Sequence, residues 1–458
     1  MKLISAGAAQ TVTGSCHFLE LNGLKLVVDC GLFQGGRETE ALNYESFPFE
    51  PGDLDAVLVT HGHLDHVGRL PLLAKQGYGG PVYATLATRR VAEVILRDSA
   101  KIQSEDYERA LRKAERAGRE DEVEKPLYSE GDVDKLMGLF RTVEFGDGLE
   151  LGNKVTATFY PAGHILGSAF IELNSPDGRV ILSGDLGNRE SSLQEDFQLP
   201  RECDAVLVET TYGNRTHRSQ EETLKEFRAI LNRAEADGGK IMIPTFALER
   251  TQVILHQLKR LQEAGEVAKL PVFLDSPMAA TFTELYQESA NEFLPPIREA
   301  LARGQNPFEP ETLRITNTRD ESIEINSFEG AAVIIAGSGM MTGGRIGHHL
   351  KHNLWRENAD LMVVGYQANG TLGRRLVDGD KEVRIYGDEI KVRAQVHTVG
   401  GFSAHADQDD LLAWLEPTGN ATVYMVHGEI PVMNVFGDAL SERGRKPVSV
   451  VRNEPYEL

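Results

Sequence analysis

Residues 61 to 66 read His-Gly-His-Leu-Asp-His, which places three imidazoles and one carboxylate within one short stretch. Imidazole nitrogens and carboxylate oxygens are ligands that zinc accepts readily in proteins. His61 and His63 stand two residues apart, so their rings point the same way where the chain is extended. Asp65 and His66 then begin the next segment. The spacing predicts ligands for parts of two adjacent metal sites, and a histidine-rich turn without metal is the alternative.

A strand must position this stretch, because the apolar, β-branched run Val57–Val59 leads directly into it. Apolar runs elsewhere in the chain also end in residues with ligand-type side chains: Asp29, His164, Asp185, Glu209 and His427. Each of these residues alone is more often structural. Loops at strand ends are where rigid scaffolds carry chemistry, so their joint occurrence predicts one site along one edge of a sheet system.

The other elements follow from hydrophobic periodicity. Residues 1–60 read as strands and tight turns, and helical spacing of apolar residues follows over 70–76 and 85–103. Charges of both signs crowd residues 104–134, which predicts an exposed helical segment without a catalytic role. Short apolar runs alternating with helix-like segments predict a second, mostly parallel sheet, with strands near 240–244, 271–274, 332–336 and 361–364.

Length and charge restrict the classes of function. The chain has 458 residues, which is more than one hydrophobic core usually supports, so two domains are expected. With 48 Lys and Arg against 69 Asp and Glu, the formal net charge is −21. This balance disfavours binding of a polyanion along the whole surface, so any nucleic-acid site must be a local patch.

Cysteine usage and hydropathy indicate the compartment. Cys16, Cys30 and Cys203 are isolated, so they predict neither a disulfide framework nor a zinc knuckle. The first residues lack the apolar core of a signal peptide, and no apolar run approaches the length of a membrane span. We therefore expect a cytoplasmic protein in a reducing compartment, with no membrane partner.

The order of these residues resembles the β-CASP ribonuclease family of the metallo-β-lactamase superfamily, which includes ribonuclease J and the endonuclease subunit of the pre-mRNA 3′-end cleavage factor. The resemblance rests on segments that span the chain from end to end: 29–31, 61–66, 208–213, 401–407 and 426–429. It implies an α/β fold, an αββα metallo-β-lactamase sandwich with an inserted α/β β-CASP domain. The expected boundaries of a compact member are 1–211 and 379–458 for the sandwich and 212–378 for the insertion.

The resemblance also implies a role for each candidate residue. It implies two zinc ions per chain, bound by seven side chains: His61, His63 and His164 at the first ion, Asp65, His66 and His427 at the second, and Asp185 as the bridge. Asp29 would orient a metal ligand by hydrogen bonding, and a carboxylate that caps a turn is the alternative. The catalytic residues would be Asp65, Glu209 and His405, with His405 as a general acid held in position by Glu209.

The implied activity is zinc-dependent hydrolysis of phosphodiester bonds in single-stranded RNA, with water activated by two metals. Endonucleolytic cleavage is the first choice, and 5′-to-3′ exonucleolytic cleavage is the alternative. A small-molecule hydrolase of the lactonase or thioesterase type is a second reading, since it needs the metal ligands but not the Glu209–His405 pair. A degenerate RNA-binding scaffold that has lost its metals is a third. A homo-oligomer is an open alternative to a monomer.

Candidate RNA contacts lie in the expected insertion. The glycine-rich segment 337–345 resembles the phosphate-contacting loop of the family. Glycines suit such a loop, because they let backbone N–H groups approach an anion closely. We expect RNA contacts from Ser338, Gly339, Arg345 and Arg250; turn glycines and solvated arginines are the alternatives. His397 is either a contact near the site or an ordinary core or surface histidine. Because Glu209 and His405 adjoin the crossings between the domains, the site is expected in an interdomain cleft.

Overall fold

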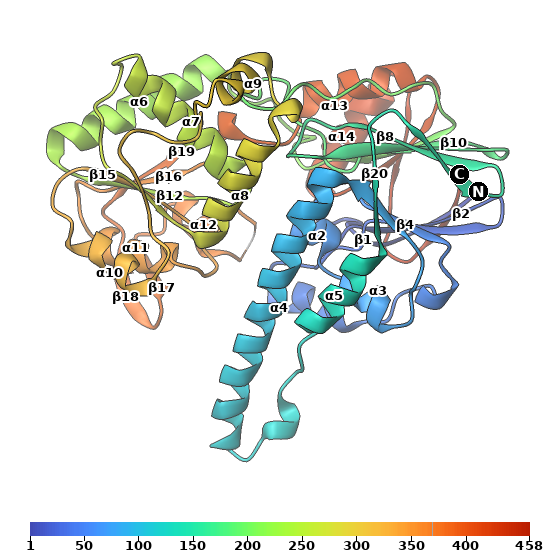
Figure 1. Ribbon diagram of the computed structural model, residues 1–458, viewed down its shortest axis with the longest axis horizontal. Helices are drawn as coiled ribbons and strands as arrows, with labels where there is room; N and C mark the ends of the chain where they lie inside the picture. The colour runs from blue at the N-terminus through green and yellow to red at the C-terminus, as the bar shows by residue number, and fades with distance from the viewer. Residues whose placement is uncertain (369) are drawn as a thin grey trace. The chain divides into compact units, whose positions relative to one another are not determined.

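Figure 1 shows the computed structural model of the protein, which describes residues 1–368 and 370–458. The chain forms two units. The first contains Met1–Arg189, Asp196–Thr216 and His405–Leu458, and the second contains Glu190–Glu195 and His217–Ala404. Each unit has sheets and cores of its own. Within the described residues, no helix is both long and apolar enough to cross a membrane.

The first unit contains two mixed sheets. One sheet has the strand order β22 (Pro455–Glu457), β1 (Lys2–Gly7), β2 (Cys16–Leu21), β3 (Leu24–Val28), β4 (Ala56–Leu58), β5 (Val82–Thr85), β6 (Phe140–Val143). The other has the order β21 (Lys446–Ser449), β20 (Thr422–Val426), β11 (Ala205–Glu209), β10 (Gly178–Leu182), β9 (Ala169–Ser175), β8 (Val155–Pro161), β7 (Gly148–Gly152). Parallel pairing of β10, β11 and β20 brings their carboxyl ends to the same edge.

The core of the first unit lies between these sheets. Alternate side chains of each strand point into it, as Leu19 and Leu26 do from one sheet and Phe159 and Leu207 from the other. The remaining residues of the second sheet pack outward against α13 (Gln408–Leu415) and α14 (Ile430–Glu442). On the outer side of the first sheet lie α2 (Leu64–Val67), α3 (Leu70–Lys75), α4 (Leu86–Glu115) and α5 (Glu130–Leu139) (Figure 1). The predicted αββα sandwich is confirmed.

Helix α4 extends the predicted helix into the charged segment. Thr85 caps its first turn by accepting a hydrogen bond from the Thr88 backbone N–H, and its buried residues end at Ala100. The outer half is exposed and carries helix-surface ion pairs such as Arg112–Glu108. Figure 1 shows this half extending away from the sheets of its unit. The shorter helical elements of the first unit are α1 (Arg37–Ala41), η1 (Leu42–Tyr44), η2 (Pro51–Asp53), η3 (Glu120–Glu122) and η6 (Glu416–Thr418).

The second unit contains a parallel sheet. Its strand order is β14 (Leu313–Ile315), β13 (Val272–Asp275), β15 (Ala332–Ala336), β12 (Lys240–Pro244), β16 (Asp360–Val363), β19 (Gln395–Thr398). Every neighbouring pair is parallel. The residues of β12, β13, β15 and β16 are buried throughout, which fits a sheet covered on both faces. These strands match the apolar runs that the sequence predicted.

Helices cover the parallel sheet. One face packs against α11 (Ile346–Asn353), α12 (Leu372–Val377) and the hairpin β17 (Glu382–Ile385)–β18 (Asp388–Lys391). On the other face lie α6 (Gln220–Asp237) and α7 (Arg250–Glu263) (Figure 1). The unit also contains α8 (Pro277–Glu288), η4 (Ala290–Glu292), α9 (Pro295–Ala302), α10 (Arg319–Ser327) and η5 (Gly400–Phe402).

The observed units differ from the expected boundaries at both ends of the insertion. Residues 212–216 lie in the first unit, Glu190–Glu195 lie in the second, and the larger difference is at the other end. Residues 379–404 were expected in the last part of the sandwich domain, but they lie in the second unit. The physical reason is that β19 pairs with β16 and completes the edge of the parallel sheet. The chain therefore returns to the first unit at His405, immediately before α13.

Candidate metal centre

Strands β3 and β4 run parallel and place their following loops side by side. Asp29 follows β3, and the His61–His66 stretch follows β4 and enters α2. The two loops touch through the backbone: the Cys30 N–H donates to the His66 carbonyl at 2.8 Å. A Cβ built on Gly31 would lie 1.5 Å from the Asp65 carbonyl oxygen, so only glycine fits there. This contact fixes the path of the histidine-rich stretch.

The Asp29 carboxylate holds the loop that follows β4 through hydrogen bonds. Its Oδ1 accepts the Thr60 N–H at 2.8 Å, and its Oδ2 accepts the Thr60 hydroxyl at 2.7 Å. The same Oδ2 lies 2.8 Å from Nδ1 of His66. Because Nδ1 is engaged there, Nε2 is the nitrogen that His66 presents on the other side of its ring. This is the geometry that the predicted orienting role of Asp29 requires.

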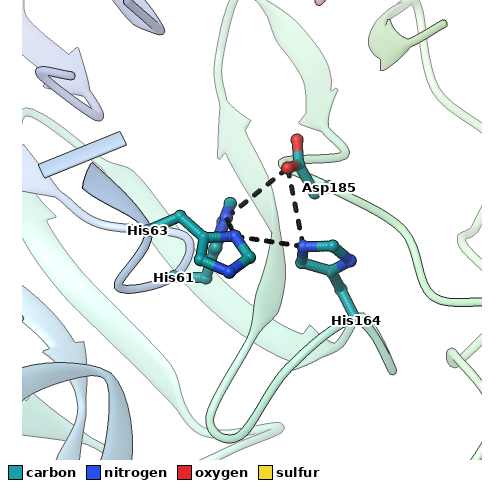
Figure 2. A group of neighbouring side chains, drawn as sticks. All are labelled: His61, His63, His164 and Asp185. Atoms are coloured by element: carbon teal, nitrogen blue, oxygen red, sulfur yellow. Dashed lines mark hydrogen bonds and ion pairs between the residues drawn. The ribbon is translucent and has the colours of Figure 1, made fainter. Parts of the chain in front are cut away.

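Figure 2 shows the first group of side chains, in which His61, His63, His164 and Asp185 converge. Nδ1 of His63 lies 3.1 Å from Nε2 of His61 and 3.2 Å from Nε2 of His164. Oδ2 of Asp185 lies 3.5 Å from the His61 nitrogen and 3.7 Å from the His164 nitrogen. Ligand atoms bonded to one tetrahedral zinc are about 3.4 Å apart, so these separations suit a single ion.

A second group contains Asp65, His66 and His427. Nε2 of His427 lies 3.4 Å from Oδ2 of Asp65. The Thr211 hydroxyl lies 3.0 Å from Nδ1 of His427, which turns the other ring nitrogen toward the group. The second oxygen of Asp185, Oδ1, lies 3.3 Å from Nε2 of His66 and 3.7 Å from Nε2 of His427. Asp185 therefore presents one carboxylate oxygen to each group.

The donor set fits a pair of divalent cations. Asp185 is 2% exposed, and among the described residues its Oδ1 has no hydrogen-bond partner, which is costly unless a cation is present. Burial lowers the pKa of His61 well below its usual value and that of His63 to about 4, so both rings are neutral at pH 7. Metal ligation requires the neutral ring. Burial also lowers the pKa of His66, but the Asp185 and Asp29 carboxylates outweigh it and raise that pKa well above its usual value, so a cation bound to His66 would take the place of a proton on its ring.

Glu209 and His405 form a third feature beside the first group. Glu209 is fully buried; its Oε1 accepts the Leu186 N–H at 2.8 Å and its Oε2 accepts the Thr211 N–H at 3.2 Å. Nδ1 of His405 lies 3.2 Å from Oε1 of Glu209 and 3.9 Å from Oδ2 of Asp185. The structure thus brings together all the predicted metal ligands and the predicted catalytic pair within the first unit.

Three supporting residues escaped the sequence analysis. Thr60 contacts both Asp29 and Nδ1 of His61, and Thr211 contacts His427. The Ser15 hydroxyl lies 3.3 Å from Nε2 of His66. Thr60 and Thr211 lie beside motif residues in the sequence, so their positions could have indicated a supporting role. The position of Ser15 in the sequence gives no such indication, because its loop comes close to His66 only in the folded chain.

The predicted RNA contacts lie in the second unit, and their settings differ from those expected. Arg345 donates to Oδ1 of Asp275 at 2.7 Å and to the Thr316 carbonyl at 3.0 Å, because Asp275 is fully buried and needs a counter-charge. Arg250 is 7% exposed, so neither arginine is an open surface cation. Ser338 and Gly339 lie in the glycine-rich loop between β15 and α11, as expected.

His397 also has a structural partner. Its Nε2 lies 2.6 Å from Oδ1 of buried Asp360, which Arg233 contacts as well. Asp360 begins β16, whereas every residue of the metal groups belongs to the first unit. His397 therefore belongs to an ion-pair network at the parallel sheet.

Comparison with known proteins agrees with this geometry. A model described as the metallo-beta-lactamase superfamily matches residues 10–236, and one described as the Beta-Casp domain matches 251–376. A third, the Zn-dependent metallo-hydrolase RNA specificity domain, matches 389–451. The chain belongs to the β-CASP family of the metallo-β-lactamase superfamily. The predicted family and the predicted class of enzyme, a metal-dependent hydrolase, are confirmed.

Individual relatives of this β-CASP protein carry two kinds of name. "Ribonuclease TTHA0252" of Thermus thermophilus is 42% identical over 99% of this chain and 98% of its own length. "Transcription termination factor FttA" of Methanocaldococcus jannaschii is 30% identical over 98% of this chain and 70% of its own length. A crystal structure of a protein of unknown function from Enterococcus faecalis V583 covers 100% of this chain and 99% of its own, with TM-score 0.56 and 12% identity. That similarity shows the fold alone.

The position of Asp185 generates a prediction about metal content. In Asp185→Asn, both groups lose a charged oxygen, so zinc content after reconstitution and dialysis should fall from about two ions per chain to fewer than one. Elemental analysis measures this. Asp147→Asn, at an exposed carboxylate, is the matched control and should keep its zinc. Retention of one tightly bound ion by Asp185→Asn would mean that Asp185 serves one group only.

Proposed function

We propose that this β-CASP protein is a zinc-dependent ribonuclease that hydrolyses phosphodiester bonds within single-stranded RNA. The observation that carries the proposal is the Asp185 carboxylate, whose two oxygens face the two ligand groups. Support for RNA as the substrate comes from the RNA specificity model over 389–451 and from the relative named as a ribonuclease.

In this proposal seven side chains hold two zinc ions: His61, His63 and His164 at the first, Asp65, His66 and His427 at the second, and Asp185 at both. When bound, the zinc ions supply an activated water molecule and positive charge opposite the phosphate oxygens. The protein contributes rigidity: Asp29 fixes the ring of His66, and Thr211 fixes that of His427. Preorganisation of this kind avoids reorientation of ligands during the reaction.

The Glu209–His405 pair is proposed to deliver the proton that the leaving 3′-oxygen requires. Two backbone N–H groups fix the Glu209 carboxylate, which faces Nδ1 of His405 at 3.2 Å. This contact favours hydrogen on Nδ1, so Nε2 is the nitrogen that would give up the proton. The products would carry a 3′-hydroxyl and a 5′-phosphate.

Internal cleavage is the proposed mode. Trimming from a 5′ end requires a group that anchors that end, and no residue of the sequence can be assigned that role. The RNA contacts proposed on the second unit are Ser338 and Gly339 in the glycine-rich loop, because glycine lets the backbone approach a phosphate closely. Contacts of this kind hold the strand at any position along its length, which is compatible with cleavage far from an end.

The proton-delivery role predicts a selective defect in His405→Ala. Its rate of RNA hydrolysis should fall roughly 10²–10⁴-fold, the usual contribution of a general acid, while its zinc content stays that of the unchanged protein. Glu209→Gln should show a smaller loss of rate, because the acid is present but less well oriented. His352→Ala, at an exposed histidine of α11, serves as the control. Loss of a zinc ion from His405→Ala would identify His405 as a ligand instead.

The mode of cleavage has its own test in a circular single-stranded RNA, which has no ends. An endonuclease opens the circle and then shortens the linear product. We expect the circle and a linear RNA of the same sequence to disappear at similar rates on a denaturing gel. If the circle survives while the linear form is degraded to mononucleotides, the protein is an exonuclease and the proposed mode is wrong.

A further inference from the structure

Phe246 is an exposed aromatic residue at the carboxyl end of a buried strand in the second unit. It follows β12 by two residues, and 39% of its surface is exposed, whereas every residue of β12 is buried. Its backbone is fixed, because the Thr251 hydroxyl lies 2.8 Å from the Phe246 carbonyl and the Thr245 N–H donates to the Ala336 carbonyl at 3.1 Å. The ring is therefore presented from a rigid loop.

Two glycines lie against this ring. A Cβ built on Gly339 would approach Cδ2 and Cε2 of Phe246 to 2.8 Å, and one built on Gly365 would lie 3.7 Å from Cε2. Gly339 follows β15 and Gly365 follows β16, the strands on either side of β12. The ring thus rests on the backbones of the neighbouring loops, at the middle of the carboxyl edge of the sheet. A side chain at position 339 would displace it.

This arrangement has the properties of a stacking surface. In parallel α/β sheets, ligands bind at the carboxyl ends of the strands. An aromatic ring that is held rigidly and left partly exposed at this edge offers a flat apolar face to a ligand that binds there. Single-stranded nucleic acids are bound through bases stacked on such rings, without dependence on sequence. Stacking is also suited to a chain of net charge −21, since it does not depend on surface charge.

We propose that Phe246 is a platform on which one base of the single-stranded RNA stacks. This inference rests on the proposed function and adds a specific contact to it. The adjoining glycine-rich loop, with Ser338 and Gly339, would lie beside the same nucleotide. Because every base has a flat face, Phe246 contributes affinity and position along the strand but no choice of sequence.

The test is binding of a fluorescent, cleavage-resistant phosphorothioate oligoribonucleotide to the zinc-loaded full-length chain, followed by anisotropy. Phe246→Ala and Phe246→Leu should raise Kd roughly five- to 150-fold, the loss expected for one stacked base. Phe246→Trp should keep Kd within about twofold, since it retains an aromatic face. The control is Trp355→Ala: Trp355 is 50% exposed but precedes β16 and so lies toward the amino ends of the strands.

Further measurements separate stacking from other effects. The dependence of Kd on salt should have the same slope in Phe246→Ala as in the unchanged protein, because no phosphate contact is removed. In a series of oligoribonucleotides with one abasic site each, the effect of Phe246→Ala should vanish at one position, where the base is already missing. Equal thermal midpoints show that the variants are folded.

Three outcomes would overturn the inference: an unchanged Kd in Phe246→Ala, an unchanged Kd in Phe246→Leu, or an equal loss in Trp355→Ala. The proposed function is tested separately, by hydrolysis of an ordinary single-stranded RNA by the unchanged protein in the same preparation. If that RNA is cut but Phe246→Ala binds normally, only the stacking role fails. If the RNA is not cut at all, the proposed function fails whatever the binding data show.

Discussion

Both ligand groups of the first unit depend on one buried carboxylate, that of Asp185. A carboxylate without solvent must be compensated, and here each oxygen faces imidazole nitrogens from a different group. Those imidazoles come from distant parts of the sequence, so the strands that carry them must end at one edge. Parallel pairing of β10 with β11 and of β11 with β20 achieves this for Asp185, Glu209 and His427. The sandwich can be understood as the scaffold that this convergence requires.

The convergence has a conformational cost that the surrounding contacts offset. Asp29 and His427 both have positive φ, 60° and 50°, where residues with a Cβ are disfavoured by on the order of 1 kcal/mol. Asp29 is held there by Thr60 and His66, and His427 by Thr211 and by its backbone N–H, which donates to the Ala8 carbonyl at 2.6 Å. The positive φ of Asp29 and of His427 bends the chain sharply at the end of each strand, and this bend directs the side chain toward the ligand groups.

Much of this arrangement was predictable because its signals are local. The His61–His66 spacing and the apolar runs that end in ligand-type residues predicted one site at a strand edge, and the family resemblance implied which residues form each group. Hydrophobic periodicity predicted the central strands of both units. Long-range pairing was not accessible in the same way. Arg345 reads as a free cation in a glycine-rich loop, yet buried Asp275, seventy positions earlier, engages its guanidinium. Residues 379–404 lie in the second unit because β19 pairs with β16, and short edge strands carry little hydrophobic pattern.

The most direct measurement is hydrolysis of a 5′-end-labelled single-stranded RNA by the purified full-length chain, with zinc content determined on the same samples. The protein is assayed as isolated, after chelation, and after stepwise return of zinc. The account predicts that chelation abolishes cleavage and that activity returns only as zinc approaches about two ions per chain. Cleavage that survives removal of the metal, or full activity at one ion per chain, would contradict it.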